Sequence, residues 1–247
     1  MRDVIKQLKH TKEILMLLLV IHVAGPLFVF FLKPFLPTEL FLGMLLISAM
    51  PSGISVVFLS ELFGGVPGKA LPVTAISHII TPIAVPFIVF FIAGTEINIP
   101  SSTMTMTLLK LIIIPYVFAL IIRRTAFYDG LNKYSLVSSQ VLLFTLLLGL
   151  ISPLASLIQQ NYSQLPLLVT VSVMMTTSFF LVSYRMGKSR KEHITFGITG
   201  SFKNFTLGTV VAVSLFSPGV ALPVIIYAVI NNMLLIPLEV FINHIKK

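Results

Sequence analysis

The side chains with the clearest chemical potential stand in one short segment, GSFKNFTLG, from Gly200 to Gly208. It carries a lysine and an asparagine between flanking glycines, and strongly apolar sequence lies on both sides. If this region crosses a bilayer, the charge of Lys203 costs roughly 2.5–3.5 kcal/mol on insertion scales. Lys203 and Asn204 are therefore candidates for binding an ion or a charged substrate.

A second segment, AMPSGIS from Ala49 to Ser55, interrupts another apolar run near mid-depth. Proline and glycine break helices and leave backbone groups unpaired, which hydrocarbon does not tolerate, so both breaks must face protein or water. Gly/Pro-interrupted spans at matching places in two halves are the best sequence indication of a transporter binding site. The candidate binding residues at the breaks are Pro51, Ser52, Gly53, Ser55, Thr199, Ser201, Lys203 and Asn204.

Three further polar residues are weaker candidates. His78 lies with Thr74 on the span that follows the first break, and His22 lies in the first apolar run. A lone histidine in a core is more often a hydrogen-bonded structural residue than a ligand. That structural interpretation is favoured for both histidines.

The composition is that of a membrane protein. Of the 247 residues, 56% are hydrophobic and only 10% are charged, and the mean hydropathy is +1.02, whereas soluble domains carry about 25% charged residues. There is no cysteine, which excludes disulfides and thiolate metal sites. We therefore expect an all-α polytopic membrane protein in the lipid bilayer, with no cofactor and no metal site.

Apolar runs of about 20 residues predict eight spans. Short connections rich in turn residues leave no room for an extramembrane domain. A signal peptide at the N-terminus is the alternative for the first run, but that run is long and no small-residue cleavage site follows it. The predicted spans are roughly 13–33, 38–62, 70–93, 106–122, 135–157, 165–186, 192–216 and 219–242.

The basic residues separate cleanly on this layout. Fourteen lysines and arginines fall on one side, and two, Lys33 and Lys110, fall on the other. This bias predicts that both termini of a multi-pass protein of the cell (plasma or inner) membrane are cytoplasmic. It also explains the basic composition without nucleic acid, which we do not expect as a partner.

The first three and the last three spans have similar lengths, and in each triplet the middle span is the interrupted one. The triplets start on opposite sides of the membrane, which predicts an inverted repeat. The support is spacing and topology, since residue identity between the halves is slight. The alternative is that these glycines and prolines serve only helix packing. The predicted parts are a basic N-terminus (1–12), a first core repeat (13–93), two panel helices (106–157) and a second core repeat (165–242).

The segments LLISAMPSGISVVFLSELFGG and KALPVTAISHIITP resemble the region around the first break of the bile acid:sodium symporter superfamily. The segment ITFGITGSFKNFTLGTVVAV resembles the second break of that family. The resemblance implies ten spans, with a core of two inverted triplets and a panel of four helices. Two spans that normally precede the first triplet have no counterpart here, so either the form is shortened or a homodimer partner completes the panel.

The resemblance also implies a departure at the sodium ligands. Where sodium-coupled members carry a Ser-Asn pair, this chain has Val56 and Val57 beside Ser55. Where they carry Glu and Gln, it has Thr199 and Lys203, while Asn204 is retained. A sodium site usually includes a carboxylate, and an ammonium within about 4 Å of a cation repels it strongly at low dielectric. We therefore expect that sodium does not bind in the family manner.

Lys203 has three possible roles. It binds an anionic substrate next to half-helix N-termini, it exchanges a proton and couples transport to it, or it holds the crossing helices together through carbonyls. The main hypothesis is a secondary transporter that carries a small organic anion by alternating access. The alternatives are a non-transporting truncated, sensor or scaffold protein and a conventional sodium symporter. An enzyme is not expected, because no catalytic motif is found.

Overall fold

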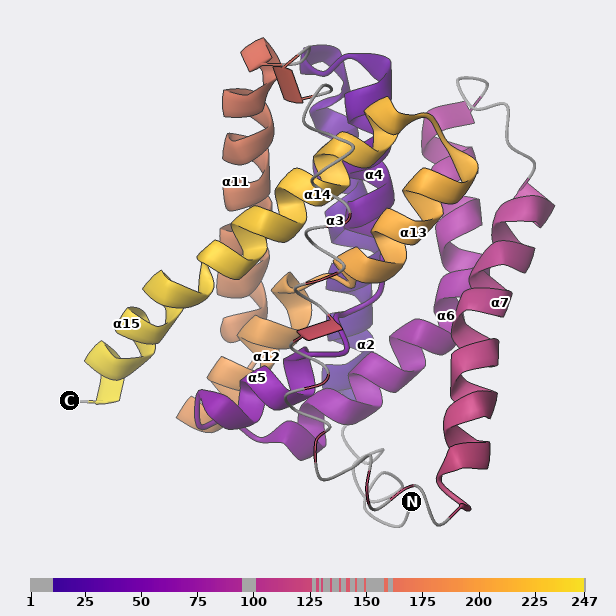
Figure 1. Ribbon diagram of the computed structural model, residues 1–247. Helices are drawn as coiled ribbons and strands as arrows, with labels where there is room; N and C mark the ends of the chain where they lie inside the picture. The colour runs from indigo at the N-terminus through magenta and orange to yellow at the C-terminus, as the bar shows by residue number, and fades with distance from the viewer. Residues whose placement is uncertain are drawn as a thin grey trace.

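The computed structural model describes residues 11–94, 101–125 and 162–246, with isolated positions between 126 and 161. Every regular element of these residues is a helix, so the predicted all-α fold is confirmed. Figure 1 shows the helices packed into one bundle, with α15 extending away from it. The elements are α2 (Thr11–Leu19), η2 (Val20–Ala24), α3 (Gly25–Phe31), η3 (Lys33–Phe35), α4 (Thr38–Ala49), α5 (Val56–Leu62), α6 (Pro67–Ala93), α7 (Ser101–Ile122), η6 (Tyr162–Gln164), α11 (Leu165–Tyr184), α12 (Arg190–Ser201), α13 (Phe205–Leu215), α14 (Pro218–Met233) and α15 (Leu235–Lys246).

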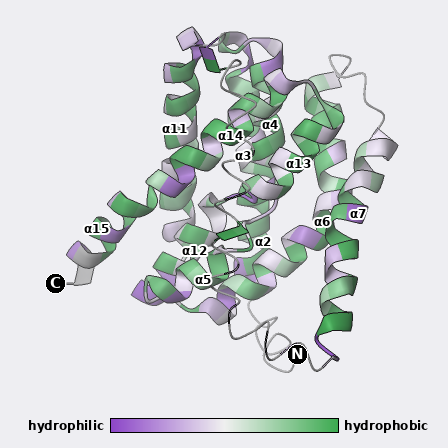
Figure 2. Ribbon diagram, in the orientation of Figure 1, coloured by the Kyte–Doolittle hydropathy of each residue, from purple (hydrophilic) through white to green (hydrophobic). Residues whose placement is uncertain are grey.

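Within the described residues, five helical segments are long and apolar enough to cross a membrane. They are Thr11–Phe31, Pro67–Ala93, Ser101–Ile122, Tyr162–Tyr184 and Pro218–Ile242. Each coincides with a predicted span, and apolar residues dominate along their length (Figure 2). The predicted span 135–157 lies largely outside the described residues.

The two interrupted spans are pairs of shorter helices. The first consists of α4 and α5, separated by residues 50–55, and the second consists of α12 and α13, separated by residues 202–204. The second break is shorter than expected, because α12 remains helical from Gly197 through Ser201. Gly197 and Gly200 serve close packing against α11 instead: a Cβ at Gly200 would lie 1.9 Å from Ser183 Oγ.

The core forms where α4 lies among its neighbours. Ten of the twelve residues of α4 are buried, and the helix packs against α3, α6, α13 and α14. On α7, by contrast, only Met104 and Leu108 are buried. A helix that is apolar on every face is suited either to a buried core or to lipid. The first environment fits α4 and the second fits α7.

The helices that follow the two interrupted spans, α6 and α14, begin with nearly the same heptapeptide. Residues 67–73 read PGKALPV and residues 218–224 read PGVALPV, so six of seven positions are identical at a separation of 151 residues. α6 begins at the first of these prolines and α14 at the second. The expectation that identity between the halves is slight was wrong for this segment, while the inverted orientation of the repeats stays a prediction.

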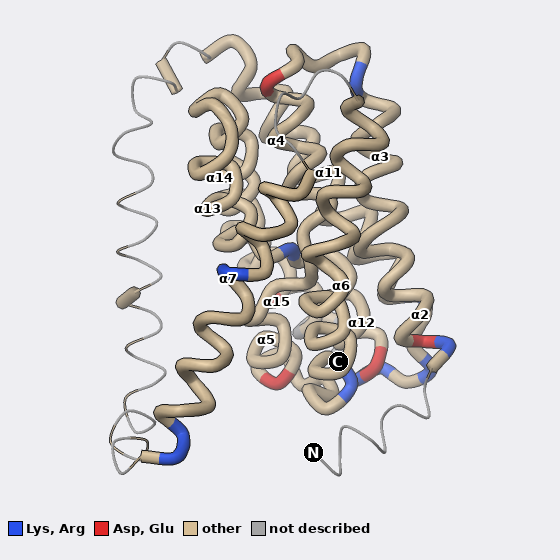
Figure 3. Tube along the Cα trace, turned by 90° about the vertical axis from the view of Figure 1, so that its right-hand side faces the viewer, with Lys and Arg blue, Asp and Glu red and all other residues tan. Residues whose placement is uncertain are grey.

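Among the described residues, lysine and arginine lie mainly at one end of the bundle, the end at which α2 begins (Figure 3). This is the distribution from which the sequence predicts a cytoplasmic location of that end. Glu39 lies at the opposite end, where the Ser217 hydroxyl donates to its Oε1 at 2.5 Å beside the start of α14.

Candidate functional site at the crossing of the broken helices

The two breaks meet each other in the middle of the bundle. Ser52 and Lys203 face each other in an antiparallel backbone bridge. Gly53 N–H donates to the Phe202 carbonyl at 2.8 Å, and Asn204 N–H donates to the Pro51 carbonyl at 2.8 Å. Backbone groups that lack a helical partner at one break are therefore hydrogen-bonded to backbone groups of the other break. A low-dielectric environment requires such pairing.

Two helices end at this crossing with their carbonyl groups directed toward it. α4 ends at Ala49 and α12 ends at Ser201. The last four carbonyls of a helix lack intrahelical donors and carry partial negative charge. The Ser52 hydroxyl satisfies one of them by donating to the Thr199 carbonyl at 2.8 Å. The crossing is thus a favourable place for a positive charge.

The Lys203 ammonium occupies that place. The residue is 2% exposed, and its Nζ donates to the Ile21 carbonyl in η2, a π-helical turn of the first span. Gly25 N–H bonds to the Val20 carbonyl, and Pro26 has no N–H, so Ile21 loses its usual donor within the helix. The lysine supplies the missing donor.

Gly25 makes room for the ammonium. A Cβ at this position would lie 2.9 Å from the Ser48 carbonyl oxygen and 3.4 Å from Lys203 Nζ. The ammonium therefore lies near the carbonyl end of α4 as well as beside the π-helical turn. Among the described residues, no carboxylate forms an ion pair with Lys203. In the part of the chain that the structure describes, the acceptor found for this ammonium is the Ile21 carbonyl.

Tyr227 of α14 fixes the backbone on either side of this lysine. Its hydroxyl donates to the Ser201 carbonyl at 2.9 Å and accepts from Lys203 N–H at 3.3 Å. It also accepts from Asn231 Nδ2 at 3.2 Å, so the hydroxyl uses its one hydrogen and both lone pairs. Sequence reasoning missed this residue. Its signal was a tyrosine followed four residues later by asparagine inside an apolar span.

Asn204 is held by two directional contacts. Its Oδ1 accepts from Leu207 N–H at 3.0 Å, which caps the N-terminus of α13. Its Nδ2 lies 3.0 Å from His78 Nε2, and His78 Nδ1 lies 2.8 Å from the Thr74 carbonyl oxygen. Both Asn204 and His78 therefore belong to the crossing. Because Asn204 already caps α13, that helix end is not an open anion site.

The structure brings most of the predicted site residues together. His22 Nδ1 donates to the Ala49 carbonyl at 3.2 Å, and Pro51, Ser52 and Gly53 are buried in the bridge. Three hydroxyl groups instead donate to their own helices: Thr74 to Ala70, Thr199 to Thr195 and Ser201 to Gly197. Ser55 alone of the predicted set is exposed, at the start of α5.

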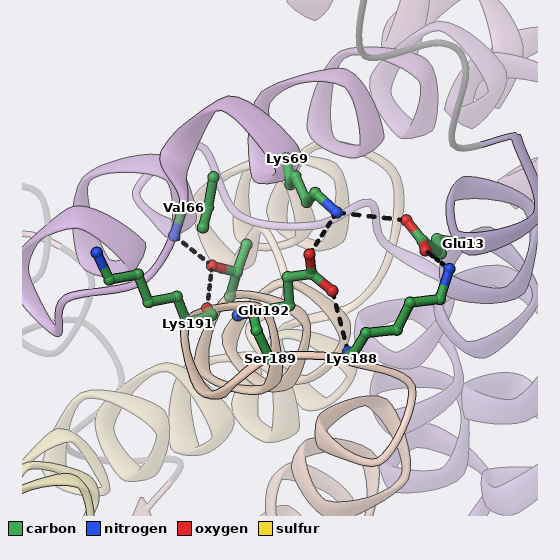
Figure 4. A network of polar contacts seen from close by, with 8 residues as sticks. Glu13, Val66, Lys69, Lys188, Ser189, Lys191 and Glu192 are labelled. Carbon is green, nitrogen blue, oxygen red and sulfur yellow. Dashed lines mark hydrogen bonds and ion pairs between the residues drawn. The ribbon is translucent and has the colours of Figure 1, made fainter. Parts of the chain in front are cut away.

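A second polar cluster lies at the basic end of the bundle (Figure 4). Lys69 Nζ lies 2.7 Å from Glu192 and 3.6 Å from Glu13, and Lys188 Nζ lies 2.8 Å from Glu13. The hydrogen bond and charge of Glu13 raise the pKa of Lys188 above its ordinary value. This cluster joins α2, α6 and the start of α12, and a pocket with room for about one water lies beside it.

The sequence profile of the SBF-like CPA transporter family matches residues 1–240. Two proteins of Bacillus subtilis (strain 168) are similar. The uncharacterized protein YbaS is 24% identical over 244 residues, which cover 92% of this chain and 78% of YbaS. The uncharacterized sodium-dependent transporter YocS is 22% identical over 209 residues, which cover 80% of this chain and 63% of YocS.

Proposed function

The chain belongs to the SBF-like CPA transporter family, a family of membrane transporters, and we propose that it carries a small organic anion by alternating access without binding sodium in the manner of sodium-coupled members. The observation that carries this proposal is the Lys203 ammonium, which is buried at the crossing and forms no ion pair with a described carboxylate.

Electrostatic repulsion by Lys203 opposes the binding of sodium at this position. Lys203 Nζ already uses the Ile21 carbonyl and lies near the carbonyl end of α4, where a bound cation would find its oxygen ligands. Two positive charges about 4 Å apart repel each other by about 4 kcal/mol even at an effective dielectric of 20. The lysine therefore acts as a cation that is part of the protein.

The same positive charge favours the binding of an anion. A buried ammonium that donates to a backbone carbonyl is stabilised further by a negative ligand nearby. Because Lys203 Nζ faces Ile21 in this conformation, the substrate would act on the ammonium from the part of the crossing that Ile21 does not cover. The candidate substrate-binding residues remain those predicted from the sequence, with Tyr227 added as a positioning residue.

The repeated heptapeptide supports alternating access. Two halves with one plan can exchange their conformations and so open a central site to each side in turn. We infer that the core repeats, 13–93 and 165–242, rock against panel helices in 106–157, with both termini cytoplasmic in the cell membrane. A homodimer that completes the panel belongs to this proposal.

A conventional sodium symporter is the second candidate, favoured by the printed name of YocS and by the retained Asn204. Thermal unfolding of the purified protein in sodium, potassium and choline chloride distinguishes the two. A ligand at about 100 times its Kd adds about 2.7 kcal/mol, so an occupied sodium site would be visible. We expect no sodium effect in the wild type and a sodium-specific rise in Tm for Lys203→Gln. A sodium-specific rise in the wild type contradicts the proposal.

The anion is tested in the same assay with carboxylates and sulfonates, each paired with its uncharged amide. We expect at least one anion to raise Tm where its amide does not, and Lys203→Gln to abolish that difference. Equal responses to anions and amides in every pair would count against an anionic substrate.

A further inference from the structure

We propose that His78 is the proton-binding residue of the crossing and that Asn204 transmits its charge state to the start of α13. Only the consequence of this switch, the coupling of protons to substrate, rests on the proposed transport function. The switch itself follows from the direction of three hydrogen bonds.

The direction of these hydrogen bonds is fixed by two backbone groups, a carbonyl that can only accept and an N–H that can only donate. The Thr74 carbonyl can only accept, so the hydrogen of His78 is on Nδ1, 2.8 Å away. Leu207 N–H can only donate, so the Asn204 atom that faces it is Oδ1, at 3.0 Å. The remaining contact, from Asn204 Nδ2 to His78 Nε2 at 3.0 Å, then has one donor and one acceptor. The three hydrogen bonds together therefore require a neutral His78 with its hydrogen on Nδ1.

A second proton on His78 is incompatible with this arrangement. It would be bound at Nε2, where it would face the NH₂ group of Asn204, and two donors would then point at each other. Turning the amide by 180° satisfies His78, but it places NH₂ against Leu207 N–H and removes the cap of α13. Protonation of His78 therefore either releases Asn204 or uncaps the helix that follows the second break.

Of the three ionisable residues at the crossing, His78, Lys203 and His22, His78 is the most exposed. It is partly exposed, whereas Lys203 is 2% and His22 is 7% exposed. Among the described residues, His22 of η2 is the titratable group whose charge acts on His78, and His22 is itself acted on by Lys203. Glu13 of α2 and Glu192 of α12 pair with Lys69 at the start of α6 instead. Glu61 of α5 and Lys110 of α7 are exposed. Because the neighbours are basic, a proton on His78 adds to a positive site, and an anion bound there would favour its uptake.

The tautomer is tested first, by NMR of protein labelled with ¹⁵N-histidine, with the His78 signal assigned by its loss in His78→Gln. We expect a neutral ring with the hydrogen on Nδ1 at pH 8. A hydrogen on Nε2 overturns the proposal.

The transmission to α13 is tested by thiol labelling, which the cysteine-free chain permits. Thr206→Cys reports on the half-buried start of α13, and Ser214→Cys, exposed near its end, is the matched control for thiol reactivity. We expect the maleimide labelling rate of the Thr206→Cys protein, divided by that of the Ser214→Cys protein, to rise at least about threefold from pH 8 to pH 6. An unchanged ratio of these two rates overturns the proposal.

Two further changes, each combined with both labelling variants, assign the effect to the pair. With His78→Gln the ratio should not depend on pH. With Asn204→Asp it should also be constant, because a carboxylate accepts from Leu207 N–H and from a protonated His78 at once. A pH dependence that persists with either change contradicts the proposed path. These measurements contain no substrate, so their failure concerns the switch and not the transport function.

Discussion

Ser52 and Lys203 lie opposite each other in a backbone bridge although 151 residues separate them along the chain. The two bonds beside this bridge have the same relation. Gly53 and Asn204, the donors, are 151 residues apart, and so are Phe202 and Pro51, the acceptors. The separation equals that of the two heptapeptides, so equivalent positions of the two halves meet at the crossing. The equivalence ends at the side chains, since one half supplies a hydroxyl and the other an ammonium.

The space beside the ammonium is predicted to depend on Gly25. Gly25→Ala places a Cβ 2.9 Å from the Ser48 carbonyl oxygen, which belongs to rigid backbone. We expect a loss of about 1–3 kcal/mol in the free energy of unfolding, as is typical of overpacking. Val23→Ala, on an exposed face of the same span, is the control and should change it much less. Equal effects of the two changes would show that Gly25 does not provide this space.

The hydroxyl of Tyr227 is predicted to hold the end of α12. Tyr227→Phe leaves the Ser201 carbonyl and Lys203 N–H without this partner, and an unsatisfied buried polar group costs about 1–3 kcal/mol. Tyr162→Phe is the control, because Tyr162 is 76% exposed, and it should stay within about 0.5 kcal/mol. Denaturant unfolding in detergent measures both. A Tyr227→Phe protein as stable as the control would show that the Tyr227 hydroxyl does not hold the end of α12.

Gly200 and Ser183 are predicted to be coupled by size. Gly200→Ala should destabilise the protein by roughly 1–3 kcal/mol, because its Cβ would lie 1.9 Å from Ser183 Oγ and 2.7 Å from Ser183 Cβ. Ser183→Gly removes both obstructing atoms, and Ser183 Oγ has no described partner to lose. The double variant should therefore be more stable than Gly200→Ala alone. A double-mutant cycle measures this coupling, and additive effects would refute it.

The ion pairs of Lys69 and Lys188 at the basic end are predicted to contribute unequally to stability. Lys69→Met leaves two carboxylates without the cation between them, and its side chain is 13% exposed. We expect a loss of roughly 1–3 kcal/mol, between the values for surface and for fully buried pairs. Lys188→Met should cost less, because that side chain is 76% exposed. The reverse order in thermal unfolding would contradict this assignment.

The Lys188 pair also predicts an alkaline pH dependence. Glu13 raises the pKa of Lys188 in the folded protein, so the pair contributes fully below the ordinary lysine pKa of about 10.4 and is lost as pH rises through the raised value. The difference in Tm between the wild type and Lys188→Met should be constant from pH 6 to 9 and should shrink above pH 10. A difference that grows with pH would have the wrong sign.

The sequence by itself determined the class of this protein and the location of its breaks. Runs of apolar residues set helix positions because a span must bury about 20 residues in hydrocarbon. Proline and glycine in AMPSGIS marked the first break, because they cannot continue a regular helix there. Lys203 was identifiable because a charge in an apolar run is costly, and it therefore indicates a function.

The tertiary structure decided what each of these residues contacts. The donor lost by Ile21 depends on a π-helical turn. The bonds from Tyr227 to Ser201 and Lys203 depend on how α14 packs in the bundle, and neither feature is a local property of the sequence. Gly197 and Gly200 did not break α12, because they lie within a continuous helix where close packing against α11 leaves no space for a Cβ. Asn204 became a helix cap bonded to His78, 126 residues away, and only the assembled crossing fixes the directions of those hydrogen bonds.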